Sequence, residues 1–261
     1  MAATPADKTA AKKLADDFAA RTTGHAFACG TRADIADGLK VRVDQPEKIY
    51  QGNTGLCPSA SVLYSIVKDK PVDYVKAVAA LYETGEATIG NWNLKPCADL
   101  KNYVLTATDT VPAVDWIPMA SMRDSENWFI DFEATDDEGG AWGGEVAKYL
   151  KKAGYTTILE EWNYFLSKNQ AHLDRASDLY TAKDHNVLLL IDGDLLTDTD
   201  DAFSFMPNHW VVLASSITYT AGSDSKLAVK LTVFTWGNKK DIQMNLTYFL
   251  RHYYGFVACK Y

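Results

Sequence analysis

Cysteine pairs of the kind that bind zinc or shuttle electrons are missing from this sequence. The four cysteines, Cys29, Cys57, Cys97 and Cys259, stand far apart, and none belongs to a Cys-x-x-Cys motif. A zinc site or a redox dithiol of that type is therefore not expected. A disulfide between two of the four stays open, because the sequence does not show which cysteines lie close together.

Long apolar runs are absent as well. No segment approaches the roughly 20 apolar residues that span a bilayer, so we expect no membrane insertion. The N-terminal stretch Met-Ala-Ala-Thr-Pro-Ala-Asp-Lys lacks the apolar core of a signal peptide. We therefore expect a chain that is cytoplasmic as synthesised and that could be secreted only by a specialised system.

Positive charge is in short supply. Lys and Arg number 26 against 34 Asp and Glu, which gives a formal net charge of -8. This balance argues against nucleic acid or an anionic membrane as a partner.

The sequence shows no repeat, low-complexity tract or linker. We therefore expect a single domain over 1–261, in which 1–24 forms an N-terminal helical arm.

Apolar periodicity predicts helices in the first part of the chain and strands in the second. The predicted helices are 7–20, 57–67, 72–84, 114–126, 145–152 and 171–183. The predicted strands are 155–159, 187–191, 210–216, 226–236, 240–245 and 255–260. Residues 39–43 alternate apolar and basic side chains and are expected to be extended. The pattern indicates an α+β fold with an antiparallel sheet.

The segment 192–201 is rich in aspartate, which raises the question of calcium. An EF-hand loop needs glycine at its sixth position and glutamate at its twelfth, and this segment has neither. We interpret it as a solvated loop and expect no metal and no cofactor.

Cys57 is the candidate nucleophile. It follows the loop Gln-Gly-Asn-Thr-Gly-Leu that begins at Gln51, and Pro58 comes directly after it. Proline is favoured in the first turn of a helix, so Cys57 is expected at a helix N-terminus, where the partial positive charge favours a thiolate. A buried, unreactive cysteine at a helix start is the alternative.

His209 is the candidate base among five histidines. It opens the predicted strand 210–216, which is expected to pair as an antiparallel hairpin with 226–236 and so to bring residues 234–236 beside it. His25 is expected in a loop. His172 and His185 are expected in solvent, and His252 is expected to be structural. A thiolate, an imidazole and an oxyanion donor together make a cysteine hydrolase.

These stretches resemble the papain-like cysteine peptidase superfamily. That family has Gln-Gly six and five residues before its cysteine and a Gly two residues before it, which are Gln51, Gly52 and Gly55 here. Its histidine opens a strand, as in His209-Trp210-Val211-Val212. Its next strand ends in Asn-Ser-Trp-Gly, where this chain has Phe-Thr-Trp-Gly from Phe234.

The chain departs from the family at two positions. Phe234 replaces the asparagine that orients the imidazole, and phenylalanine cannot accept a hydrogen bond. Thr235 or Asn238 could take over that role, or Cys57 and His209 could act as a dyad. Pro58 replaces an aromatic residue, which puts the usual protease cleft in doubt.

The resemblance implies a papain-like fold, in which a helical half carrying the nucleophile helix packs on an antiparallel β-sheet half. It also implies roles for the matched residues. Cys57 would be the nucleophile and His209 the general base and acid, paired as thiolate and imidazolium. The Gln51 side chain and the Cys57 backbone N–H would form the oxyanion hole. Trp236 would shield His209, and Gly55, Asn208 and Trp236 would line the substrate site.

The implied function is hydrolysis of an amide bond in a protein or peptide-like substrate, as a protease, amidase or deamidase. A transglutaminase-like acyl transferase and a catalytically silent binding module are the alternatives. The chain also resembles a group of bacterial papain-like effector toxins delivered by contact-dependent systems such as type VI secretion. That resemblance implies an immunity protein as a further partner.

Overall fold

The computed structural model describes residues 3–106, 109–126, 143–162, 169–182, 185–196, 207–221 and 227–261. The chain divides into two compact units. One comprises 2–139 with 152–154 and is called the helical unit. The other comprises 140–151 with 155–261 and is called the sheet unit. The expectation of one domain over 1–261 stays a prediction.

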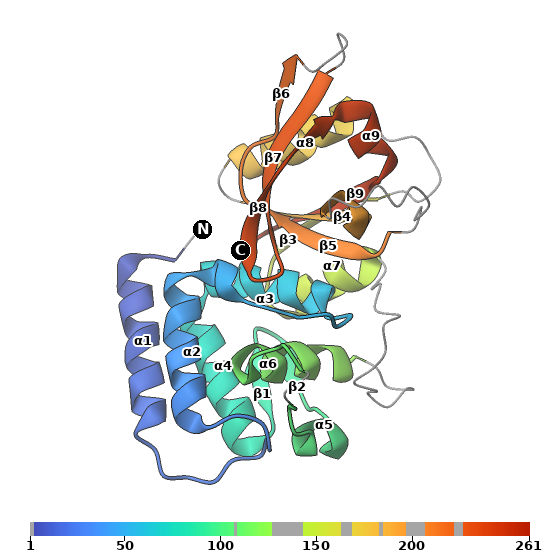
Figure 1. The fold of residues 1–261 in the computed structure, drawn as a ribbon. Helices are drawn as coiled ribbons and strands as arrows, with labels where there is room; N and C mark the ends of the chain where they lie inside the picture. Colours follow the sequence, from blue (N-terminus) through green and yellow to red (C-terminus); the bar gives the residue numbers. More distant parts are fainter. Residues whose placement is uncertain are drawn as a thin grey trace. The chain divides into compact units, whose positions relative to one another are not determined.

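The helical unit contains most of the helices, labelled in Figure 1. Its elements are α1 (Pro5–Ala19), α2 (Arg32–Asp44), the 3-10 helix η1 (Pro46–Lys48), α3 (Cys57–Asp69), α4 (Pro71–Thr84), β1 (Ala87–Ile89), β2 (Trp92–Leu94), α5 (Ala98–Asn102) and α6 (Ala113–Asp124). Within this unit α1 packs against α2 and α4, and α3 packs against α4 and α6. Strands β1 and β2 form an antiparallel hairpin.

The predicted extended segment 39–43 is wrong, because these residues lie inside α2. Thr31 caps this helix by accepting the backbone N–H of Asp34. Leu39 and Val43 are four residues apart and both buried, which is helical spacing, and the basic residues between them lie on other faces of the helix. The expected N-terminal arm corresponds to α1, whose buried residues Ala11, Ala15 and Phe18 pack into the unit.

Helix α3 is apolar and buried along almost its whole length. Every residue from Cys57 to Val67 is buried. The next helix, α4, ends at Gly85, which adopts φ of +77°, a conformation that glycine reaches without steric cost. Both helices were predicted from apolar spacing, and the structure confirms them. Among the described residues, no helix combines the length and hydropathy that crossing a bilayer requires.

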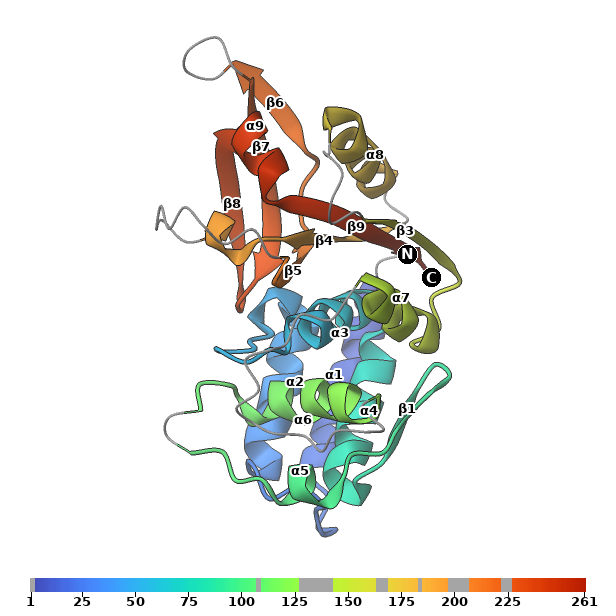
Figure 2. The same ribbon diagram turned by 90° about the vertical axis from the view of Figure 1, so that its right-hand side faces the viewer.

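The sheet unit is built on a seven-stranded antiparallel sheet in the order β3-β9-β4-β5-β7-β6, with β8 also pairing with β7. Its strands are β3 (Thr157–Trp162), β4 (Asn186–Ile191), β5 (His209–Leu213), β6 (Thr218–Ala221), β7 (Leu227–Thr235), β8 (Asn238–Asn245) and β9 (Tyr253–Lys260). Its other elements are α7 (Gly143–Lys152), whose last residue belongs to the helical unit, α8 (Gln170–Thr181), the 3-10 helix η2 (Gly193–Leu196) and α9 (Leu246–Arg251). Figure 2 shows α8 and α9 beside these strands.

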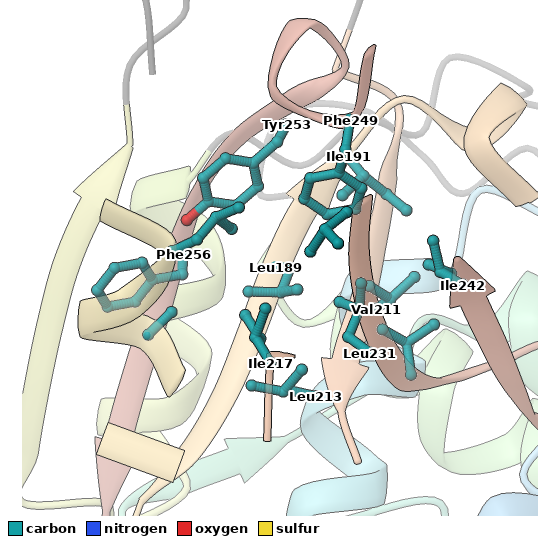
Figure 3. Close-up of a cluster of buried hydrophobic side chains, with 14 of the residues drawn as sticks. Leu189, Ile191, Val211, Leu213, Ile217, Leu231, Ile242, Phe249, Tyr253 and Phe256 are labelled. Carbon is teal, nitrogen blue, oxygen red and sulfur yellow. The ribbon is translucent and has the colours of Figure 1, made fainter. Parts of the chain in front are cut away.

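The core of the sheet unit lies on one face of the sheet. Side chains from alternate positions of the strands meet α8 and α9 in a single apolar cluster, shown in Figure 3. Its members include Leu189, Ile191, Val211, Leu213, Leu231, Val233, Phe249 and Phe256. Because side chains alternate between the two faces of a strand, this cluster defines which residues of β5 and β7 share a face.

The mixed α+β class with an antiparallel sheet is confirmed. The predicted antiparallel pairing of β5 with β7 is also present, through Val212 with Phe234 and Leu213 with Val233. The two strands are not a simple hairpin, because β6 lies between them in sequence and pairs with β7 as well.

Candidate active site

Cys57 is the first residue of α3 and is only 3% exposed. Pro58 lies in the first turn, where a missing N–H leaves no intrahelical bond unmade. The N-cap residue Leu56 has an apolar side chain, which cannot accept a hydrogen bond from that turn. Cys57 therefore stands at the N-terminus of a buried helix, the end that carries a partial positive charge.

The loop before α3 is a closed turn around Gln51, which is 5% exposed. The Gln51 Nε2 donates to the carbonyl of Thr54 at 3.4 Å, and the Thr54 hydroxyl donates to the carbonyl of Gln51 at 2.6 Å. Gly52 adopts φ of +61°, and a Cβ at this position would lie 2.5 Å from Oγ1 of Thr110. The turn therefore requires glycine and restrains the Gln51 side chain. Gly55, expected to line the substrate site, is half-buried in the same loop.

The imidazole of His209 is held by Thr235. His209 opens β5 and is 5% exposed, and its Nε2 lies 2.7 Å from Oγ1 of Thr235 at the end of β7. Val211 and Val233, each two residues away along its strand, both belong to the apolar cluster. Alternation therefore places His209 and Thr235 on the same face of the sheet, where diagonal neighbours come into contact.

From the sequence, His209 could be oriented by Thr235, by Asn238 or by no third residue. The observed hydrogen bond is the one to Thr235. Phe234 pairs with Val212 and, by alternation, projects from the opposite face. Asn238 is exposed and pairs with Thr235 across the β7–β8 turn. The structure therefore brings Thr235 to the imidazole by a hydrogen bond that involves neither Phe234 nor Asn238.

Trp236 covers one side of the imidazole. The two ring centroids are 4.6 Å apart, with the planes tilted by 32°. Trp236 and Gly237 form the two-residue turn between β7 and β8, with φ of +44° and +75°. Positive φ at both positions is the type I′ geometry that suits a two-residue hairpin, and it is strained for a residue with a bulky side chain. The turn accommodates this strain in the segment that places the indole beside His209.

Burial lowers the pKa of His209 to about 4, because the protein interior disfavours the charged imidazolium. The imidazole is therefore neutral near pH 7. This direction works against the resting imidazolium that the papain-like resemblance implies. A neutral ring has a free lone pair that can accept a proton, and the low pKa makes it a weak base.

Asn208, expected at the substrate site, has a structural hydrogen bond. Its Oδ1 accepts the backbone N–H of Gly193 at 2.7 Å, at the start of η2. Asp192, directly before Gly193, is buried and not solvated as predicted, and it pairs with His252, which was expected to be structural. Nδ1 of His252 lies 3.2 Å from Oδ2 of Asp192, and both side chains are buried. Asp192 directly follows β4, so this pair anchors the strand that pairs with β5.

The expectation of a solvated His172 is wrong. Its Nδ1 lies 3.1 Å from the Tyr253 hydroxyl, and its Nε2 lies 3.3 Å from Oε2 of Glu161. His172 is in the first turn of α8, so it links that helix to strands β3 and β9. The prediction relied on the charged residues near His172 in sequence, and these give no sign of partners that lie far away along the chain.

The four cysteines are free thiols, which excludes the disulfide that the sequence left open. Burial raises the pKa of Cys29 to about 11, and burial is also the largest cause of the raised pKa of Cys97.

No group of three or more His, Cys, Asp or Glu that could hold a metal occurs in the described part of the chain. The residues 197–201 of the aspartate-rich segment lie outside that part.

The candidate catalytic residues are divided between the two units. Gln51 and Cys57 belong to the helical unit, whereas His209, Thr235 and Trp236 belong to the sheet unit.

In comparisons with known proteins, the sequence matches no family model and no curated protein.

Proposed function

We propose that this chain is a cysteine hydrolase that cleaves an amide bond. Cys57 is the nucleophile, His209 is the general base and acid, and Thr235 orients the imidazole. Gln51 and the backbone N–H of Cys57 stabilise the oxyanion. The observation that carries the proposal is the 2.7 Å hydrogen bond between Nε2 of His209 and Oγ1 of Thr235, because it gives a buried imidazole one orientation.

In the proposed mechanism each ring nitrogen of His209 has its own role. When Nε2 carries the proton and donates to Thr235, Nδ1 keeps its lone pair and can act as a base. A threonine hydroxyl is a neutral acceptor, as the asparagine amide of the papain-like pattern is. The substitution of Phe234 for that asparagine is therefore compatible with catalysis.

The reaction then proceeds in two stages. Nδ1 of His209 takes the proton of the Cys57 thiol, and the thiolate attacks the amide carbonyl to form a tetrahedral oxyanion. Collapse of this intermediate breaks the C–N bond, and the imidazolium gives its proton to the leaving amine. Water, activated by the neutral imidazole, attacks the thioester, and the thiol is released as the acid product departs.

The lowered pKa of His209 makes the isolated ring a weak base, so proton transfer depends on the charge that forms beside it. Near pH 7 the ring is neutral and ready to accept a proton, and the imidazolium forms when the thiolate does. Opposite charge beside an imidazolium favours its charged form. The imidazolium is thus stabilised by the same thiolate that attacks the substrate, and it remains a strong proton donor to the leaving group.

Acylation by p-nitrophenyl acetate, mapped by mass spectrometry, tests the proposal without a known substrate. We expect acetyl transfer to Cys57, followed by hydrolysis, and loss of both steps in Cys57→Ala and His209→Ala. Cys29, Cys97 and Cys259 are internal controls in the same molecule. Full turnover in either variant, or acetylation spread evenly over the four cysteines, contradicts the proposal.

A primary-amine probe separates the hydrolase from an acyl transferase. If acetyl-Cys57 forms and water resolves it while the amine is not acetylated, the hydrolase is supported. Preferential transfer to the amine would make the protein a transferase. A Cys57 that is never acylated would instead indicate a binding module.

A further inference from the structure

The helical unit contains a buried ion pair that the proposed mechanism does not use. The carboxylate of Asp115, in the first turn of α6, is 0% exposed. It accepts two hydrogen bonds from Arg42 of α2: Nε donates to Oδ1 at 3.1 Å and Nη2 donates to Oδ2 at 2.6 Å. A bidentate geometry of this kind fixes the carboxylate in both position and plane.

The same carboxylate holds the chain next to the proposed oxyanion donor. Oδ2 of Asp115 accepts the backbone N–H of Tyr50 at 3.1 Å. Tyr50 directly precedes Gln51, so this bond fixes the peptide plane between Ile49 and Tyr50, one residue before Gln51. A displacement of Tyr50 would therefore move the backbone from which the Gln51 amide projects.

The chain just before α6 restrains the other side of the turn. A Cβ on Gly52 would lie 2.5 Å from Oγ1 of Thr110 and 2.9 Å from Cγ2 of Val111. The glycine backbone thus packs directly on residues 110 and 111, a few positions before Asp115. Tyr50 and Gly52, which flank Gln51, are both held by the segment 110–115.

Stability alone does not account for a buried pair of this kind. Replacing a buried ion pair by apolar residues of similar size is often neutral or stabilising, because the desolvation of two charges offsets their attraction. Geometry is what the pair supplies here: a fixed acceptor for one particular backbone N–H. An apolar residue at position 115 could fill the space but could not accept the Tyr50 N–H.

We propose that Asp115, fixed by Arg42, is a positioning residue that holds the Gln51 turn so that the Gln51 amide can stabilise the oxyanion. This inference rests on the proposed function, since it assigns a support to one of its groups. Asp115 acts through the Tyr50 N–H and makes no contact with the reacting atoms.

Two reagents separate oxyanion stabilisation from thiol reactivity. Iodoacetamide alkylates Cys57 by displacement of iodide, in which no oxyanion forms. p-Nitrophenyl acetate acylates the same thiol through a tetrahedral oxyanion. The ratio of the acylation rate to the alkylation rate therefore measures the oxyanion hole. We expect Gln51→Ala to lower this ratio by roughly 10²-fold, the scale of losing one oxyanion donor.

A matched pair of double variants isolates the acceptor. Arg42→Met with Asp115→Asn removes both charges but keeps a carbonyl oxygen for the Tyr50 N–H. Arg42→Met with Asp115→Leu removes the charges and the acceptor. We expect the asparagine variant to keep the ratio of the unaltered protein. We expect the leucine variant to lower the ratio as much as Gln51→Ala does, and adding Gln51→Ala to the leucine variant to lower it no further. Asp115→Ala replaces leucine if the larger side chain prevents folding.

Hydrogen exchange of the Tyr50 amide provides a second measurement that requires no activity. We expect protection in the asparagine variant and rapid exchange in the leucine variant. A leucine variant that keeps the Tyr50 amide protected, or keeps a Gln51-dependent ratio, overturns this inference and leaves the proposed function intact. A ratio that Gln51→Ala does not change in the unaltered protein contradicts the proposed oxyanion hole, and this inference fails with it.

Discussion

Nε2 of His209 and Oγ1 of Thr235 lie 2.7 Å apart on one face of the sheet, on two strands that pair antiparallel. Both side chains are buried, at 5% and 4% exposure. This hydrogen bond gives the buried imidazole one orientation, and in the proposed mechanism Nε2 donates to Thr235 while Nδ1 is the base. This relationship is the basis of the predictions for the sheet unit.

Thr235→Val keeps the shape of the side chain but removes the hydrogen-bond acceptor. We expect the acylation rate of Cys57 to fall at least about tenfold, because a positioned imidazole contributes about 10²–10⁴-fold through proton transfer and a loose ring loses part of that. Thr235→Ser retains the hydroxyl and is the matched control. Equal rates for the valine and serine variants would show that the hydrogen bond does not orient a base.

The stability of the sheet unit is expected to depend on pH through His209. Its pKa is about 4 in the folded protein and about 6.5 when unfolded, so the unfolded chain binds the proton more readily. This contribution to stability is complete above pH 6.5 and is lost as pH falls from 6.5 toward 4, at roughly 1.4 kcal/mol per pH unit. Urea unfolding at several pH values measures it. His209→Gln should lack this component, and a variant with the unchanged pH dependence would contradict the burial effect.

Trp236 is expected to reverse the usual order of alanine and glycine. Both Trp236→Ala and Trp236→Gly remove the indole, so the lost packing is the same. Only alanine retains the left-handed strain at φ of +44°, which costs about 1–2 kcal/mol. Glycine should therefore give the more stable protein by about 1 kcal/mol in urea unfolding. A more stable alanine variant would mean that the β7–β8 turn has a different backbone conformation.

Gly52→Ala tests the turn before α3. Alanine there is disfavoured by φ of +61°, and its Cβ would lie 2.5 Å from Oγ1 of Thr110. We expect a loss of stability of about 1–2 kcal/mol from the backbone conformation alone, together with a lower acylation rate as Gln51 moves. Gly24→Ala is the matched control, since nothing lies within 4 Å of a Cβ at Gly24. Similar behaviour of the two variants would show that the turn tolerates a side chain.

Periodicity in the sequence was enough to predict much of the fold and one half of the candidate site. The expected strand pairing brings residues 234–236 beside His209 but leaves Thr235, Asn238 and a dyad open. The observed register of β5 and β7 places residues 209 and 235 on one face. Pro58 and the apolar spacing after it likewise predict the helix that Cys57 opens. These predictions depend on local patterns, which the sequence carries directly.

The misses arise where partners are distant or where two periods coincide. Leu39 and Val43 fit both an alternating strand and one face of a helix, and packing of α2 against α1 and α6 decided for the helix. The bonds of Asp115 to Arg42 and Tyr50 join residues more than 60 positions apart. No spacing rule predicts such a contact. The pKa of His209 was missed because it depends on burial in the folded protein.

Alkylation of Cys57 by limiting iodoacetamide, followed site by site between about pH 5 and 9, tests the central claim most directly. The claim is that His209 activates Cys57. We predict that Cys57 reacts faster than the internal controls Cys29 and Cys97 below the ordinary thiol pKa of about 8.5, and that His209→Ala removes this advantage. A Cys57 that reacts no faster than the other cysteines, or that is unaffected by His209→Ala, would contradict it.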